Sequence, residues 1–123
     1  MGAQPALESV REILGRFLEK VLQEMPVDAA YLFGSYAQGY AEEHSDIDVA
    51  IVSSAMSGVR FTDNVRLAKL RRSVDPRIEP WGFRPEDFND DQIMPAEVLK
   101  TGIKLFPPDT ANSLEEALSK RTP

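Results

Sequence analysis

Apolar residues recur every three or four positions across residues 5–25, and charged residues fill the opposite side. The stripe consists of Leu7, Val10, Leu14, Phe17, Leu18, Val21, Leu22 and Met25. This spacing predicts an amphipathic helix, which ends at Pro26 because proline interrupts helical hydrogen bonding. A second amphipathic helix is predicted over residues 61–74, with Thr62 or Asp63 as its N-cap.

Short apolar runs between and after these helices predict strands. The first covers residues 27–33, and a second spans residues 46–52, where Ile47, Val49 and Ile51 alternate with other residues. A third covers residues 76–83, interrupted or ended by Pro80, which suits a sheet margin. A short helix over residues 95–101 precedes residues 103–106, which either add an edge strand or pack on the sheet. This order predicts an α/β (α+β) fold, a small mixed sheet flanked by helices.

The chain is organised around residues 31–52, which predict a strand, a tight turn at Gly34-Ser35, a helix over residues 35–41, a loop and a strand. Because strand side chains alternate, Asp46 and Asp48 lie on one face, with Cα atoms about 6.6 Å apart. Their charges would repel by roughly 2.5 kcal/mol at an effective dielectric near 20, and a cation would reverse that sign. Helix N-termini attract anions, so this region suits a divalent metal and a polyphosphate.

Length and composition restrict the class of protein. The 123 residues predict one domain over residues 1–108 and a peripheral tail over residues 109–123, where an S-x-x-E capping motif lies at residues 113–116. No apolar run reaches membrane-spanning length, and the absence of cysteine fits a cytoplasmic protein whose chemistry depends on carboxylates. A net charge of −6 disfavours direct nucleic-acid binding and leaves room for a basic protein partner.

The motif G-S-Y-A-Q-G at residues 34–39, followed by S-D-I-D-V-A at residues 45–50, resembles the nucleotidyltransferase superfamily of DNA polymerase beta. It is most similar to the minimal nucleotidyltransferase (MNT) group of MntA-type antitoxins. The resemblance implies that Gly34 and Ser35 hold the triphosphate of ATP, while Asp46 and Asp48 bind Mg²⁺. It also implies a third catalytic and metal-binding carboxylate on the next long strand. Glu79 occupies that place, and Asp75 is its rival.

The resemblance further implies transfer of AMP from ATP to a hydroxyl of a partner protein, a helical HEPN-type toxin. Two alternatives stay open: a subunit that modifies small molecules such as aminoglycosides, and a catalytically silent antitoxin that only binds. Gln38 replaces an arginine found in many relatives, which removes a cation near the phosphates. His44 is interpreted as a solvated loop residue. If part of the substrate-binding pocket is missing, another chain in a homo- or hetero-oligomer would supply it.

Overall fold

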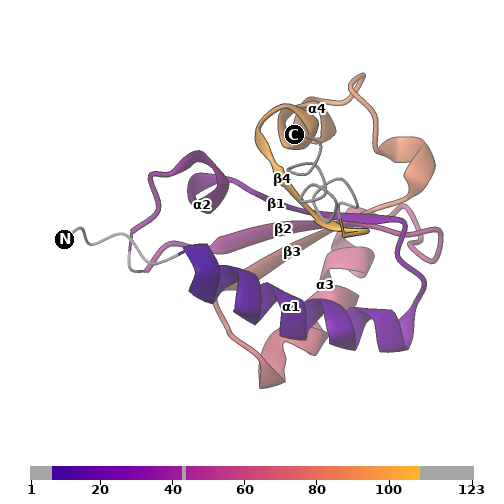
Figure 1. The fold of residues 1–123 in the computed structure, drawn as a ribbon. Coiled ribbons are helices and arrows are strands. Elements are labelled where there is room, and N and C mark those ends of the chain that lie inside the picture. The colour runs from indigo at the N-terminus through magenta and orange to yellow at the C-terminus, as the bar shows by residue number, and fades with distance from the viewer. Residues whose placement is uncertain (1–6, 43, 109–123) are drawn as a thin grey trace, which may run out of the picture.

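The computed structural model describes residues 7–42 and 44–108. The elements in chain order are α1 (Leu7–Glu24), β1 (Ala29–Phe33), α2 (Ser35–Gln38), β2 (Ile47–Val52), α3 (Arg60–Leu70), η1 (Arg71–Ser73), β3 (Ile78–Phe83), η2 (Pro85–Asp87), α4 (Ile93–Thr101) and β4 (Ile103–Phe106). Figure 1 shows α1 and α3 on one side of the sheet and α4 on the other. The capping motif predicted at residues 113–116 lies outside the described residues. Within the described ranges, no helix is both long and apolar enough to cross a membrane.

The four strands form one mixed sheet in the order β3-β2-β1-β4. Strand β1 is antiparallel to both β2 and β4, whereas β2 and β3 run parallel. The predicted mixed sheet flanked by helices is therefore confirmed, and residues 103–106 do form an edge strand. The parallel register places Asp48 beside Glu79, and the antiparallel register places Asp48 opposite Phe33, the last residue of β1.

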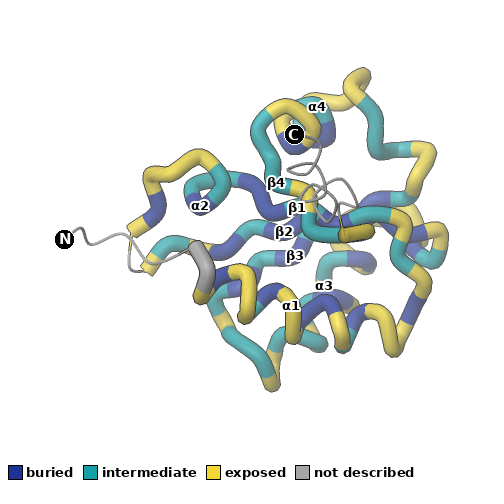
Figure 2. Tube along the Cα trace, viewed as in Figure 1, coloured by how far each residue is buried: buried dark blue, intermediate teal, exposed yellow. Residues whose placement is uncertain are grey.

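The main core lies between the sheet and the helices α1 and α3. Ile47, Val49 and Ile51 are completely buried there, as the two-residue period of β2 requires. They belong to one apolar cluster with Phe17 of α1 and Leu67 of α3. Figure 2 shows buried and exposed stretches alternating along α1, as an amphipathic helix requires. Burial of these large side chains supplies most of the apolar stabilisation of this layer.

The opposite face of the sheet is only partly covered. Ala50, Val52 and Phe83 pack there in a second cluster with Phe33 and with Val98 of α4. Asp48 lies two residues before Ala50, and Glu79 lies four residues before Phe83, so both acids lie on this face. Unlike the residues of the cluster, the two acids are half-buried. The fold thus leaves a partly open face where the carboxylates lie.

Pro80 does not interrupt β3, contrary to the alternatives predicted from the sequence. The Ile47 N–H donates to the Arg77 carbonyl at 2.8 Å, and the Ser53 N–H donates to the Phe83 carbonyl at 3.0 Å. Odd-numbered positions of β3 therefore bond to β2, and Pro80 faces the free edge of the sheet. There its missing N–H removes no bond from the ladder, so the strand continues to Phe83.

Two predicted helix boundaries were wrong. Helix α2 ends at Gln38, not at residue 41, because Gly39 adopts a left-handed conformation with φ 88° and closes the turn. Helix α3 begins after Val59 without a side-chain cap, so neither Thr62 nor Asp63 is its N-cap. Asp63 instead lies inside the helix and accepts hydrogen bonds from the Ser57 N–H, the Ser57 hydroxyl and the Gly58 N–H.

Candidate functional site

Three carboxylates from neighbouring segments lie on the partly open face. Asp46 directly precedes β2 and is exposed, whereas Asp48 is the second residue of β2 and is half-buried. Glu79 is next to Asp48 in the parallel register of β3. The charges of Asp46 and Glu79 both act on Asp48, so the structure brings together the three acids predicted from the sequence.

The glycine turn lies against the central carboxylate. Gly34 has φ 77° and ψ −151°, a conformation that is accessible essentially to glycine alone. A Cβ atom at Gly34 would also overlap Oδ2 of Asp48. The turn therefore lies so close to Asp48 that there is no room for a side chain at position 34.

Ser35 is the first residue of α2 and is half-buried. The first N–H groups of a helix have no partner within the helix, so those of α2 open next to Asp48. Gln38, at the other end of this four-residue helix, is exposed, and so is His44 in the following loop. Neither side chain forms a hydrogen bond or an ion pair with the acids.

The pKa of Asp48 is raised from 3.8 to about 6, mainly because burial penalises its charged form. The negative charges of Asp46 and Glu79 raise the pKa of Asp48 further. The Trp81 indole N–H partly offsets the rise, but it makes no hydrogen bond of normal geometry. Among the described residues, the indole nitrogen is the buried side-chain polar atom that has no hydrogen-bond partner. Asp48 therefore lacks a positive counter-charge.

The rival acid, Asp75, is already paired. Its carboxylate accepts hydrogen bonds from the Arg77 guanidinium at 3.0 and 3.1 Å and from the Arg77 backbone N–H at 2.9 Å. The bonds from Arg77 also hold the pKa of Asp75 below its usual range. Arg77 reaches the Tyr36 hydroxyl as well, at 3.4 Å, and so connects this loop to α2. Asp75 thus has a structural role, and Glu79 is the free acid beside Asp48.

The donor set suits a hard divalent cation. Carboxylate oxygens are the ligands that Mg²⁺ prefers, and a cation would remove the charge repulsion that acts on Asp48. Within residues 7–42 and 44–108, however, no three acidic, histidine or cysteine side chains converge closely enough to form a complete metal cage. A cation bound here would therefore have to take several of its ligands from phosphate and water.

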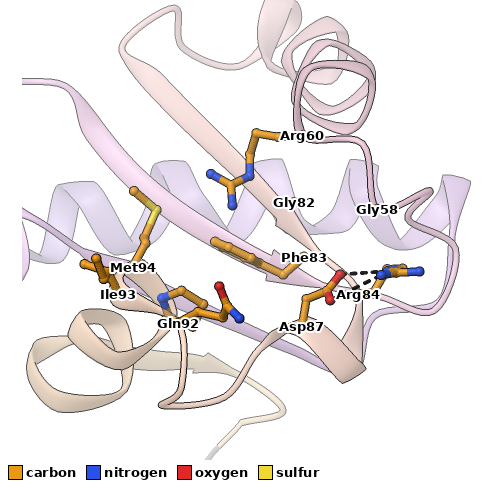
Figure 3. Close-up of a pocket in the computed structure, with 10 residues that line it drawn as sticks. Gly58, Arg60, Gly82, Phe83, Arg84, Asp87, Gln92, Ile93 and Met94 are labelled. Atoms are coloured by element: carbon orange, nitrogen blue, oxygen red, sulfur yellow. Dashed lines mark hydrogen bonds and ion pairs between the residues drawn. The ribbon is translucent and has the colours of Figure 1, made fainter.

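A cavity of about 440 Å³ lies farther along the same side of the molecule, beyond the carboxyl end of β3. Figure 3 shows the Phe83 ring between Arg60 on one side and residues of the α4 N-terminus on the other. The Arg60 guanidinium lies 5.1 Å from the Phe83 ring centroid and 5.8 Å from that of Trp81. Arg84 and Asp87 form an ion pair at the rim, at 2.7 Å.

From the sequence, Trp81 was interpreted as core or pocket wall and Arg60 as part of a basic region that could contact phosphate or a partner, whereas Arg77 was missed. Trp81 follows Glu79 by two positions in a strand, so its position on the same face was open to prediction. The places of Arg60 and Arg77 depend on how α3 and the loop before β3 dock. No local sequence pattern specifies those contacts.

Comparisons with known proteins agree with this geometry. The family model described as "Polymerase beta, Nucleotidyltransferase" matches residues 17–110. No curated protein sequence matches the chain significantly.

Solved structures resemble it in fold. An inferred nucleotidyltransferase from Sulfolobus solfataricus superposes with a TM-score of 0.59 at 17% identity, covering 80% of each chain. A toxin-antitoxin structure with AMP-PNP gives a TM-score of 0.59 at 22% identity, over 87% of this chain and 85% of that one. A mutant of the toxin-antitoxin MntA-HpeT gives 0.57 at 23% identity, over 82% of this chain and 77% of that one.

Proposed function

Because this chain belongs to the polymerase beta nucleotidyltransferase family, we propose that it transfers AMP from ATP to a hydroxyl of a partner protein. The observation that carries the proposal is the position of Asp48, between the Gly34 turn and Glu79. A polyphosphate on the turn and an acceptor near Glu79 would meet at this carboxylate. The raised pKa of Asp48 supports a role in binding a cation, since no described cation neutralises it.

In the proposed reaction the acceptor oxygen forms a bond to the α-phosphorus of ATP. The bond from that phosphorus to the bridging oxygen breaks, and pyrophosphate leaves with the electron pair of that bond. The acceptor proton passes to Glu79 or to water, because the exposed His44 forms no hydrogen bond or ion pair with the acids. Mg²⁺ held by Asp46 and Asp48, with Glu79 on the acceptor side, would neutralise charge on the phosphates.

The protein's own groups position the reactants. The backbone N–H groups of Ser35 and the first turn of α2 would bind phosphate oxygens, because they have no partner within the helix. Arg77 fixes the orientation of Tyr36 and so supports α2 from behind the turn. The partly open face leaves Glu79 accessible to an acceptor, whereas the other face of the sheet is filled by α1 and α3.

The toxin-antitoxin neighbours support a partner protein as the acceptor. One further neighbour, at 19% identity and a TM-score of 0.56, is an MntA-HpeT variant in which two aspartates spaced two positions apart became glutamates. Asp46 and Asp48 have the same spacing. We therefore infer an antitoxin whose partner is a helical HEPN-type toxin. One observation favours a catalytically silent antitoxin instead: the exposed Gln38 supplies no cation beside the phosphate turn.

Label transfer distinguishes these functions. The chain is incubated with Mg²⁺, a cell lysate and ATP labelled at either the α- or the γ-phosphate. We expect a protein band labelled from α-labelled ATP only, and no band with the Asp46→Asn, Asp48→Asn variant. The matched control, Asp90→Asn with Asp91→Asn, removes the same charge from an exposed loop and should label normally. Labelling from the γ-phosphate would indicate a kinase, and equal labelling by the site variant would exclude this site.

A further inference from the structure

The outward side of α3 carries an apolar stripe that the core does not use. Phe61, Val65 and Ala68 follow one another at helical spacing, and the side chains of Phe61 and Val65 are 77% and 38% exposed. The inward side of the same helix carries Leu67, which is completely buried. An exposed phenylalanine followed by apolar residues one and two turns later is the pattern of a helix that docks against another helix.

This stripe forms one wall of a groove along the free edge of β3. The groove, here called the α3 groove, has a volume of about 530 Å³, and Pro80 and Glu79 form its opposite wall. Its other lining residues are Arg60, Phe61, Asn64, Val65, Ala68 and Arg71. An occupant of the α3 groove would therefore touch Glu79, the acid adjacent to Asp48 in the sheet.

The free edge of β3 cannot readily accept another strand. The Gly82 N–H donates to Oδ1 of Asn64 at 2.8 Å, and the Ile78 carbonyl accepts from Arg71 at 2.8 Å. Pro80, between them, has no N–H. Because β-strand addition depends on free backbone groups, an occupant must bind through side chains. An amphipathic helix meets this condition, and an extended peptide does not.

The charges around the α3 groove favour an occupant with negative charge. Arg60 and Arg71 line it, and Lys69 and Arg72 line a smaller hollow that shares Val65 and Ala68 with it. In the part of the chain that the structure describes, none of these four cations forms an ion pair. The surface is thus locally basic on a chain whose net charge is −6, and an acidic segment of a partner, even of a partner that is basic as a whole, would be oriented toward it.

Resting on the proposed function, we infer that the α3 groove docks an acidic amphipathic helix of the acceptor protein and presents its hydroxyl to Glu79. Apolar side chains of that helix pack between Phe61 and Pro80. Its acidic flank faces Lys69, Arg71 and Arg72. A serine, threonine or tyrosine at the Glu79 end of the groove then lies where the reaction takes place.

The binding test uses a designed probe. A fluorescein-labelled helical peptide has leucines at positions i, i+4 and i+7, glutamates on both flanks and a terminal tyrosine, and binding is followed by fluorescence anisotropy. We expect Phe61→Ser with Val65→Ser, and separately Lys69→Glu with Arg72→Glu, to weaken binding at least about tenfold. The matched control, Leu22→Ser with Leu99→Ser, removes apolar side chains of 43% and 45% exposure from other helices and should bind normally. A peptide with lysines replacing the glutamates should not bind.

Three results would overturn the inference: no binding of the acidic peptide by the wild type, equal binding by the groove variants, or tighter binding of labelled poly-uridine at the same residues. The wild type and all groove variants should show the same rise in melting temperature with Mg²⁺ and ATP. Lysate proteins labelled equally by wild type and groove variants would refute the groove but keep the proposed function. Peptide binding with no AMP transfer to any protein would refute the proposed function but keep the docking surface.

Discussion

Asp48 lies in an environment that destabilises its charged form. Its pKa of about 6 lies above the ordinary value of 3.8, so the folded protein binds this proton more tightly than the unfolded chain does. Stability contributed by this group is therefore present below about pH 4 and is lost as the pH rises through about 6. A cation binding to the carboxylate would recover that loss.

We expect Asp48→Asn to stabilise the ligand-free protein at pH 7.5 and to have little effect at pH 4, because asparagine resembles the protonated acid. The full shift would correspond to about 3 kcal/mol, and screening of this half-buried group reduces the expected gain to about 1 kcal/mol. Urea unfolding at both pH values measures the difference. Asp90→Asn, in an exposed loop, is the control. A destabilised Asp48→Asn variant at pH 7.5 would contradict the assigned environment.

Gly34 is required by two independent features, its positive φ and its approach to Asp48. Gly34→Ala should lower the free energy of unfolding by about 3 kcal/mol, because alanine rarely adopts this conformation and its Cβ displaces the carboxylate. Gly15→Ala is the matched control. No atom lies within 4 Å of a Cβ added at this exposed position of α1, so alanine should stabilise by about 0.5–1 kcal/mol. Thermal unfolding of both variants tests the contrast, and a harmless Gly34→Ala would refute it.

At the level of single residues, the sequence predicted the site where the pattern is local. The two-residue period of residues 46–52 predicted Asp46 and Asp48 on one face; β2 begins only at Ile47, but the charge of Asp46 does act on Asp48. Selecting Glu79 over Asp75 required the family resemblance, because the β2–β3 register is a tertiary property. The structure adds the reason that Asp75 is unavailable, namely its bonds with Arg77. The Trp81 indole N–H lacks a hydrogen-bond partner and Arg60 contacts two aromatic rings. Both features depend on tertiary packing that no local sequence pattern specifies.

At the level of elements, the loop before α3 is held by one buried carboxylate. Asp63 is 1% exposed and accepts three hydrogen bonds from Ser57 and Gly58. The same loop adjoins the cavity that contains Arg60 and Phe83. Asp63 therefore sets the position of the α3 N-terminus relative to the sheet.

Asp63→Ala should lower the free energy of unfolding by about 3 kcal/mol, because it removes the buried carboxylate that accepts three hydrogen bonds from the loop. Thr62→Ala, one residue earlier at an exposed position, should change it by less than about 0.5 kcal/mol. Chemical denaturation of both variants makes the comparison. A larger effect at Thr62 would restore it as the N-cap predicted from the sequence.

The helices and strands were predicted well where periodicity was strong, and less well where single residues decide boundaries. The apolar stripe of α1 and the alternation of β2 both appear as predicted. Helix α2 was predicted too long because the left-handed conformation of Gly39 was not recognised as its end. Pro80 was correctly assigned to a sheet margin, but the strand does not stop there. Whether proline interrupts a strand depends on whether its nitrogen faces the neighbouring strand or the free edge. Only the sheet order supplies that information.

Taken as a whole, the molecule separates its stabilising core from its proposed chemistry. Helices α1 and α3 bury one face of the sheet, and the acids lie on the other, which α4 covers only in part. The α3 groove then reaches Glu79 from the sheet edge. A nucleotide entering over α2 and an acceptor entering along α3 would therefore approach Asp48 from different sides.

The most direct test of the central proposal is the intact mass of the proposed partner toxin, measured after its co-expression with this chain. With the wild-type chain we expect that protein to gain the mass of one or more AMP groups and to lose its toxicity. With the Asp46→Asn, Asp48→Asn variant we expect neither change, because the carboxylates that would bind Mg²⁺ are gone. Neutralisation by both forms without any change in mass would contradict the account and establish an antitoxin that acts by binding alone.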